Sequence, residues 1–271
     1  MNWRLVTIVI CIGIAGFQLP LETPISKVSA QTYAEKEAER QTGLTNEEMC
    51  YLAESITVRV LSTDRLVQGS GTLVYKQVQG QGWRYGVLTN AHVVLEKNSL
   101  IIQTQDDRLY PAEVIHSFAR SSSGDDLALL QFDSPVTYNL AILGTGSSLK
   151  SGDSVLSAGF PLLAEPSNSR GFACMAGSVS LVLDREMRQG YQIGYYVDVQ
   201  KGMSGGPLIN SEGEVVGING KHSHPLPFGT GNQNPYEYKD GTLVSQSREL
   251  LESSSWAIPI ERLGQTQQES P

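Results

Sequence analysis

Short apolar segments separated by turn residues run from Ile56 to Ile260, and this pattern constrains the fold more than any other feature of the chain. Ile56-Thr57-Val58-Arg59-Val60-Leu61 alternates apolar and polar side chains, as a half-buried β-strand does. Most of the other segments are shorter than an ordinary helix. The 27 glycines scattered among them favour strands joined by tight turns. We therefore predict an all-β protein.

The predicted strands form two series of six. The first series, before Pro135, comprises Ile56–Leu61, Gly71–Lys76, Tyr85–Leu88, Leu100–Thr104, Ala112–His116 and Leu127–Phe132. The second, after a turn at Leu149–Asp153, comprises Ser154–Ala158, Phe172–Val182, Tyr191–Val199, Pro207–Asn210, Glu214–Ile218 and Trp256–Ile260. Six short strands at this spacing are typical of a closed barrel. The fold prediction is therefore two six-stranded antiparallel β-barrels, over residues 56–145 and 146–265.

Three segments lie outside the strand pattern. Residues 31–55 are charged and favour a helix, which Thr45-Asn46-Glu47-Glu48 would begin. Arg248–Leu251 predicts a short helix near the C-terminus. Lys221–Asp240 is rich in Gly, Asn, Pro and His without any periodicity, which predicts a long loop.

The first thirty residues are typical of an export signal. Arg4 is followed by the apolar run Leu5–Phe17, and Val28-Ser29-Ala30 offers small residues for cleavage, so we expect a mature chain that begins near residue 31. An uncleaved membrane anchor is the alternative. The expected location is secreted or periplasmic, without stable membrane association once the signal is removed.

Two cysteines, Cys50 and Cys174, remain after the signal segment is removed. In an oxidising compartment they can form a disulfide between the N-terminal segment and the second half of the chain. Two separate buried thiols fit the sequence equally.

Charge and histidine content exclude several classes of partner. The chain has 20 Lys and Arg residues against 28 Asp and Glu, a formal net charge of −8, and no basic stripe, so we expect no nucleic-acid partner. His222 and His224 could form half of a metal site, but no third His or nearby Cys supports them. We predict no metal and no cofactor.

One glycine-rich motif, Gly202-Met203-Ser204-Gly205-Gly206-Pro207, has the features of a nucleophile turn. A nucleophilic serine needs an exposed hydroxyl on a tight turn, with free backbone amides that bind the developing oxyanion. The amides of Gly202 and Ser204 are the candidates for this oxyanion hole. Taken alone, the motif is also compatible with an ordinary Gly-Ser turn between strands.

A histidine and an aspartate stand at the ends of two other strands. His92 closes the apolar strand before it in Thr89-Asn90-Ala91-His92, and imidazole can accept a serine proton near neutral pH. Asp126 abuts the apolar run Leu127–Leu130, where a carboxylate could be fixed to orient the imidazole. The order is His, Asp, Ser, with separations of 34 and 78 residues. Either residue alone could be structural, but together with Ser204 they predict a catalytic triad.

The chain resembles the trypsin-like bacterial serine peptidases, which are related to chymotrypsin and to the high-temperature-requirement proteases. The motifs that carry this resemblance lie between residues 56 and 220 and are Gly69-Ser70-Gly71-Thr72, Thr89-Asn90-Ala91-His92, Asp126-Leu127-Ala128-Leu129-Leu130, Gly202-Met203-Ser204-Gly205-Gly206-Pro207 and Gly213-Glu214-Val215-Val216-Gly217-Ile218. Ala257-Ile258-Pro259-Ile260 also looks similar.

The resemblance implies a fold, a site and a substrate class. It implies chymotrypsin-like barrels with the triad in the cleft between them, and a polypeptide substrate that pairs with backbone near Ile218, Asn219 and Gly220. Asp198 stands six residues before Ser204, where trypsins have the acidic floor of their primary pocket, so a preference for Arg or Lys is a hypothesis.

The chain also departs from trypsins. Met203 replaces the aspartate that in trypsins pairs with a freed N-terminus, so activation by that ion pair is not expected. The few residues after Ile260 predict no peptide-binding PDZ domain.

Two functions other than a peptidase fit parts of the sequence. Gly202-Met203-Ser204-Gly205-Gly206 also satisfies the G-x-S-x-G motif of α/β-hydrolases, but that fold needs a helix after the serine and its histidine far downstream. Here a predicted hairpin follows, so this rival fails. The other alternative is a two-barrel protein- or peptide-binding module in which the triad is idle.

Overall fold

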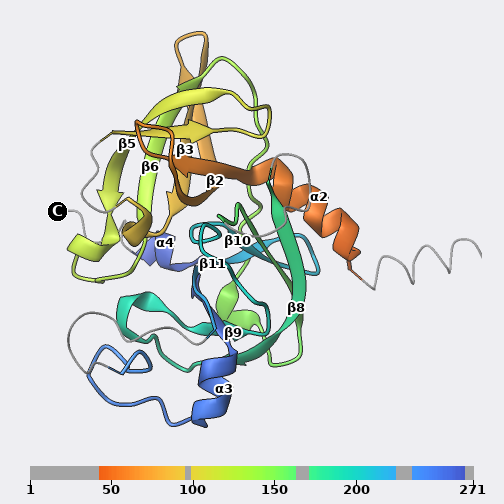
Figure 1. Cartoon of the computed structure of the whole chain (residues 1–271), viewed down its shortest axis with the longest axis vertical. Coiled ribbons are helices and arrows are strands. Elements are labelled where there is room, and N and C mark those ends of the chain that lie inside the picture. Colours follow the sequence, from red (N-terminus) through yellow and green to blue (C-terminus); the bar gives the residue numbers. More distant parts are fainter. Residues whose placement is uncertain (1–42, 95–98, 163–170, 224–233, 266–271) are drawn as a thin grey trace, which may run out of the picture. The chain divides into compact units, whose positions relative to one another are not determined.

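Two closed antiparallel β-barrels of six strands each form the described part of the chain, one above the other in Figure 1. The structure is a computed structural model that describes residues 43–94, 99–162, 171–223 and 234–265. The two-barrel, all-β prediction is confirmed. The predicted export signal lies outside the described residues. Among the helices that the structure describes, none is both long and apolar enough to cross a membrane.

The first barrel surrounds a core of aliphatic and aromatic side chains that includes Val58, Leu73, Tyr85, Ile102 and Leu130. These residues are buried because strand alternation points every second side chain inward. The strands pair in the order β1-β2-β3-β6-β5-β4, and β4 closes the ring on β1. Their bounds are Thr57–Leu61 (β1), Val67–Gln79 (β2), Gly82–Thr89 (β3), Ser99–Gln103 (β4), Leu109–Ser117 (β5) and Ala128–Ser134 (β6).

The second barrel has its own core, which includes Val155, Val179, Tyr195, Leu208 and Val216. Its strands are Ser154–Gly159 (β7), Ala173–Val182 (β8), Ile193–Tyr195 (β9), Pro207–Asn210 (β10), Val215–Lys221 (β11) and Ser255–Pro259 (β12). They pair in the ring β7-β8-β9-β12-β11-β10. This is the connectivity of the first barrel repeated, although the two halves show no sequence repeat.

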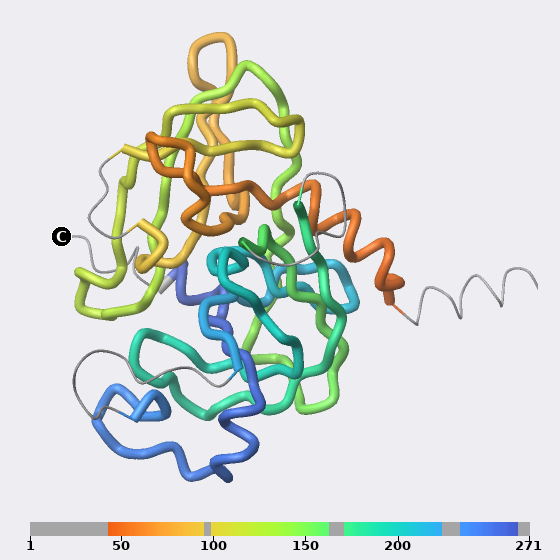
Figure 2. The backbone as a smooth tube through the Cα atoms, in the orientation of Figure 1, coloured from red at the N-terminus to blue at the C-terminus, as the bar shows by residue number. Residues whose placement is uncertain are grey.

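The chain crosses from the first barrel to the second through the light green segment that follows β6 in Figure 2. The amide of Ala141 donates to the carbonyl of Leu73 in the first barrel at 2.8 Å, and the amide of Gly144 donates to Val215 in the second at 3.0 Å. The connection is therefore hydrogen-bonded to both barrels.

Helix α2 (Asn46–Ile56) precedes the first barrel but packs against the second. It begins where the sequence predicts, because the Thr45 hydroxyl accepts from the Glu48 amide while the Glu48 carboxylate accepts from the Thr45 amide. A disulfide joins Cys50 on this helix to Cys174 on β8, with their Cα atoms 5.7 Å apart. The helix therefore links the start of one barrel to the wall of the other.

The remaining helices are short. They are α3 (Arg248–Ser253), α4 (Arg262–Gln265) and the 3₁₀ turns η1 (Ala91–Val93), η2 (Phe118–Arg120), η3 (Gly146–Ser148) and η4 (Arg188–Gly190). The predicted helix at Arg248 is present, and the Ser247 hydroxyl accepts from the Leu250 amide at its start.

Most of the predicted strands differ from the observed ones at one or both ends, and two of these differences have a structural cause. Ile56 belongs to α2 rather than to β1, since the helix continues through the first residue of the alternating segment. The predicted strand at 191–199 contains only β9, Ile193–Tyr195, because the residues after it turn away toward Ser204.

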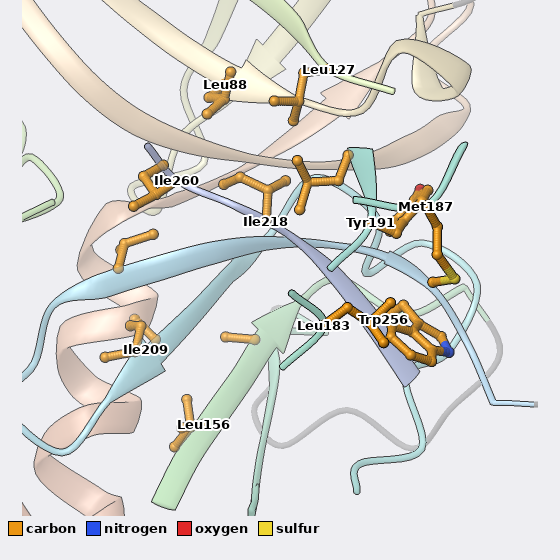
Figure 3. Packing of buried hydrophobic residues seen from close by; sticks show 14 of the residues in the cluster. Leu88, Leu127, Leu156, Leu183, Met187, Tyr191, Ile209, Ile218, Trp256 and Ile260 are labelled. Atoms are coloured by element: carbon orange, nitrogen blue, oxygen red, sulfur yellow. The ribbon is translucent and has the colours of Figure 1, made fainter. Parts of the chain in front are cut away.

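The seam between the barrels is apolar. A single core cluster contains Leu88 and Leu127 from the first barrel together with Tyr191, Ile218 and Ile260 from the second. Figure 3 shows Leu88 and Leu127 above Ile218 and Ile260. Burial of each such side chain contributes about 1.5–3 kcal/mol, so the two barrels are held in a defined orientation.

Candidate active site

Asp126 and His92 meet at the surface of the first barrel, beside this seam. The Asp126 carboxylate accepts two hydrogen bonds from His92, from the backbone amide to Oδ1 at 2.9 Å and from ring Nδ1 to Oδ2 at 2.6 Å. An ionised carboxylate only accepts hydrogen bonds, so the proton of the neutral imidazole lies on Nδ1. Nε2 is then left with a lone pair and can accept a proton.

The local structure explains how the two residues come together. β3 and β6 are neighbours in the barrel, and Thr89 pairs with Ala128 at their ends. The turn η1 then presents His92, while the Asn90 side chain donates to the backbone carbonyl of Asp126 at 2.9 Å. Asp126 is 5% exposed and the His92 side chain 41% exposed, so a buried carboxylate orients an accessible imidazole.

Asp125 has a different partner set, which explains why only one of the two adjacent aspartates serves His92. Its carboxylate is fully buried and is bonded by Lys239 at 2.9 Å and by two nitrogens of Arg262 at 2.8 and 2.9 Å. These cations come from the second barrel. Asp125 therefore anchors the loop, and Asp126 faces the histidine.

Ser204 lies on a tight turn that leads into β10, as its glycines predict. Gly202 and Gly205 have φ values of +98° and +88°, in the region that favours glycine. A Cβ on Gly205 would lie 2.1 Å from the Ser70 carbonyl oxygen and 2.2 Å from the Thr89 hydroxyl, so no side chain fits there. The turn can therefore approach the first barrel closely.

Ser70 on β2 fixes the nucleophile turn to the first barrel. Its amide donates to the Ser204 carbonyl at 2.8 Å and its hydroxyl donates to the Gly202 carbonyl at 2.7 Å. Gly69 beside it lies between the two halves of the site. A Cβ on Gly69 would be 2.8 Å from the Val93 side chain and 3.0 Å from the Ser204 carbonyl oxygen. The Ser204 carbonyl and the side chain of Val93, the residue after His92, therefore both lie close to Gly69.

The turn also leaves two amides available. Among the described residues, neither the Gly202 nor the Ser204 amide donates a hydrogen bond, whereas the amides of Met203, Gly205 and Gly206 all do. A Cβ on Gly202 would lie 2.4 Å from the Phe160 carbonyl oxygen, so this position requires glycine. Two free amides that flank one buried residue could bind a single oxyanion.

Met203 is that buried residue. It is fully buried in the core of the second barrel, in the cluster that contains Val155 and Leu208. An apolar anchor therefore stands where the resemblance to trypsins would put an ion-paired aspartate.

Ile218 and Asn219, two residues of the predicted substrate edge, also pair within the second barrel. Ile218 pairs with Pro207 on one side and with Ile258 on the other. The Asn219 amide donates to the Gly206 carbonyl at 3.0 Å, and its carbonyl accepts from the Gly205 amide at 2.9 Å. The substrate edge near Ile218, Asn219 and Gly220 stays a prediction.

Asp198 lies on the segment between β9 and the nucleophile turn. Asp198 is exposed, while its neighbours Val197 and Val199 are buried. The floor of a pocket is normally enclosed, so this exposure adds no support to the basic-residue preference, which stays a prediction.

Three residues near Asp126, His92 and Ser204 carry no signal in the sequence that predicts their contacts. Ser70 stood only inside a glycine motif, and Tyr191 only inside a predicted strand. The Tyr191 hydroxyl donates to Asp126 Oδ2 at 2.6 Å, and the Lys221 ammonium lies 4.3 Å from the centre of the Tyr191 ring. No local pattern marks these contacts, since they join residues distant along the chain.

Comparisons with known proteins identify a family. The family of trypsin-like peptidase domains matches residues 69–218, more than half of the chain. Serine protease Do-like HtrA of Bacillus subtilis (strain 168) is 30% identical over 162 residues, 58% of this chain and 34% of that protein. Serine protease HTRA2, mitochondrial, of Drosophila grimshawi is 35% identical over 137 residues, 49% of this chain and 30% of that protein. The chain thus spans about a third of the length of these relatives.

A solved structure shares the fold. The HtrA-type protease AlgW with tripeptide superposes with a TM-score of 0.59 at 20% identity, over 83% of this chain and 63% of that one. At this identity the likeness concerns the fold alone.

Proposed function

This chain belongs to the family of trypsin-like peptidase domains, and from that premise we propose that it is a serine endopeptidase that cleaves polypeptides through an acyl-enzyme. Ser204 is the nucleophile, His92 the general base and then the general acid, and Asp126 the residue that orients the imidazole. The observation that carries the proposal is the pair of hydrogen bonds that the His92 amide and ring donate to the Asp126 carboxylate. They leave Nε2 as the proton acceptor beside the seam.

In the proposed reaction the Ser204 hydroxyl attacks a peptide carbonyl carbon while His92 Nε2 takes its proton. The C–O bond forms and the carbonyl π pair moves to oxygen, where the Gly202 and Ser204 amides stabilise the negative charge. The oxyanion then collapses, the C–N bond breaks, and the imidazolium protonates the leaving amine. Water repeats the sequence on the ester, which releases the acid and restores Ser204.

Substrate position is part of the proposal. An extended peptide pairs with the backbone near Ile218, Asn219 and Gly220, as the resemblance to the trypsin-like peptidases implies. The hypothesis of an Arg or Lys preference at Asp198 is tested separately by digestion of a peptide library. Cleavage without enrichment of basic residues before the scissile bond refutes it.

A fluorophosphonate probe tests the central claim without a known substrate. We expect one probe molecule per chain, mapped by mass spectrometry to Ser204, together with hydrolysis of fluorescent casein. Ser204→Ala and His92→Ala should abolish labelling, while Ser211→Ala, at the β10–β11 turn, should be labelled like the wild type. An unlabelled wild type, or equal casein turnover by Ser204→Ala, would mean that the triad is idle and would favour the binding-module alternative.

We also propose that the protein works outside the cytosol. The Cys50–Cys174 disulfide supports this, because disulfides persist mainly in oxidising compartments. The intact mass of protein purified from its producing cells tests the predicted cleavage near residue 31. A mass that retains the first thirty residues contradicts a removed signal.

A further inference from the structure

Asp126 carries one hydrogen bond that the triad itself does not account for. Its Oδ2 atom accepts from His92 Nδ1 at 2.6 Å and also from the Tyr191 hydroxyl at 2.6 Å. The remaining oxygen, Oδ1, accepts from the His92 amide. The tyrosine is thus the one side chain from the second barrel that the described structure shows bonded to this carboxylate.

Tyr191 is built rigidly into the second barrel. It is 1% exposed and belongs to the seam cluster. Its carbonyl accepts from the Met187 amide at 2.8 Å, which closes the turn around η4. The same turn holds the Asp126 backbone, since the Asp126 amide donates to the Gln189 carbonyl at 2.9 Å. The η4 turn and the tyrosine after it therefore bond both the backbone amide and the carboxylate of Asp126.

The tyrosine hydroxyl occupies a space that a glycine provides. A Cβ on Gly220 would lie 2.2 Å from the Tyr191 hydroxyl oxygen and 2.7 Å from a ring carbon. Any side chain at 220 would therefore displace the ring from Asp126. Gly220 and Tyr191 are a matched pair, although 29 residues separate them in the sequence.

The charges around the carboxylate fit this arrangement. Burial and the negative charge of Asp126 raise the pKa of Tyr191 well above its ordinary value, so the hydroxyl keeps its proton and can only donate to the carboxylate. The buried Lys221 ammonium lies over the Tyr191 ring at 4.3 Å. Other titratable groups around this region are His92, Tyr195 and Asp125, and Asp125 is paired with Lys239 and Arg262.

We propose that Tyr191 is a positioning residue for catalysis, whose hydroxyl, in the space left by Gly220, fixes Asp126 in the orientation that serves His92. This inference rests on the proposed function of the triad. Because Asp126 belongs to the first barrel and Tyr191 to the second, the hydrogen bond aligns the triad only while the barrels are docked.

The test removes the hydroxyl and keeps the ring. In the full chain, Tyr191→Phe should lower the second-order rate constant of fluorophosphonate labelling at pH 8 about tenfold. This factor corresponds to the loss of one hydrogen bond to a charged group, taken near the lower end of the free energies of such bonds. The acid limb of the pH–rate profile should also move to higher pH. Without the hydroxyl, more of the negative charge on Asp126 Oδ2 is available to hold the imidazolium.

Tyr195→Phe is the matched control. Tyr195 is also fully buried, but its hydroxyl donates to Asn219 Oδ1 at 2.8 Å and does not touch Asp126. We expect the control to keep the acid-limb midpoint of the wild type. Gly220→Ala is a second route to the same result, because its methyl group should push the intact tyrosine off Asp126.

Three results would overturn the inference. They are a Tyr191→Phe profile that superposes on the wild type, a rate that falls equally at every pH with an unmoved midpoint, and a Tyr195→Phe profile shifted like that of Tyr191→Phe. If Tyr191→Phe does not fold, an unmoved midpoint in Gly220→Ala also overturns it. An unlabelled wild type refutes the proposed function instead, so the two failures are distinguishable.

Discussion

Replacing Lys221 with methionine should change how stability depends on pH. Lys221 is 4% exposed, and burial lowers its pKa from 10.5 to about 8, while the charge of Asp126 partly opposes this. Because the unfolded chain binds the lysine proton more tightly than the folded one, the free energy of unfolding rises as the pH increases from about 8 to 10.5. Below about pH 8 Lys221 is protonated in both the folded and the unfolded chain, so the whole free-energy cost of burying its charge is present.

The size of the effect follows from these values. Each pKa unit is worth 1.36 kcal/mol, so the full contribution is about 3 kcal/mol, most of which changes between pH 7 and pH 10. Methionine keeps most of the side-chain volume and carries no proton. The stability of Lys221→Met relative to the wild type should therefore fall by roughly 2–3 kcal/mol over this range.

Urea unfolding followed by tryptophan fluorescence at pH 7, 8, 9 and 10 measures this difference. Tyrosines with raised pKa, such as Tyr191, are present in both proteins and cancel in the comparison. Lys150→Met, at an exposed position, corrects for the loss of one positive charge. The reasoning is refuted if the free energies of unfolding of Lys221→Met and the wild type differ by the same amount at every pH from 7 to 10.

Two further substitutions test the supports of the barrels and of the nucleophile turn. Cys50→Ala with Cys174→Ala opens a loop of 124 residues and should lower the free energy of unfolding by up to about 5 kcal/mol, with urea unfolding of the reduced wild type as the reference. Equal stability of the variant and the oxidised wild type would show that the bridge adds nothing. Met203→Ala should cost about 2–5 kcal/mol through the cavity it leaves and slow Ser204 labelling, because the oxyanion amides lose their anchor. A variant that is less stable yet labelled at the wild-type rate would separate the anchor from the oxyanion hole.

Properties encoded by neighbouring residues could be predicted from the sequence. The alternation at Thr57–Leu61 predicts β1, the Thr45-to-Glu48 capping box marks the start of α2, and the glycines around Ser204 predict its turn. Each of the twelve strands in the described residues overlaps a predicted one, although β9 is shorter than its apolar run because tertiary contacts turn the chain toward Ser204 after Tyr195. The pairing of Cys50 with Cys174, which the sequence left open, is a disulfide in the structure.

Properties that depend on distant contacts could not be predicted. The pairing of Asn219 with Gly205 and Gly206 is one such property, because it forms only when the turn is folded against β11. The fit between Tyr191 and Gly220 is another, because the Tyr191 hydroxyl reaches the space beside Gly220 only in the folded chain.

The two halves of the site are each fixed by the opposite barrel. Ser204 belongs to the second barrel, yet its turn is bonded through two carbonyl groups to Ser70 of the first. Asp126 belongs to the first barrel, yet it is bonded to Tyr191 and Gln189 of the second. A small shift of one barrel would therefore disturb the nucleophile and the carboxylate together. Since the barrels are also joined by an apolar seam and a disulfide, stable docking of the barrels and alignment of the triad are the same structural requirement.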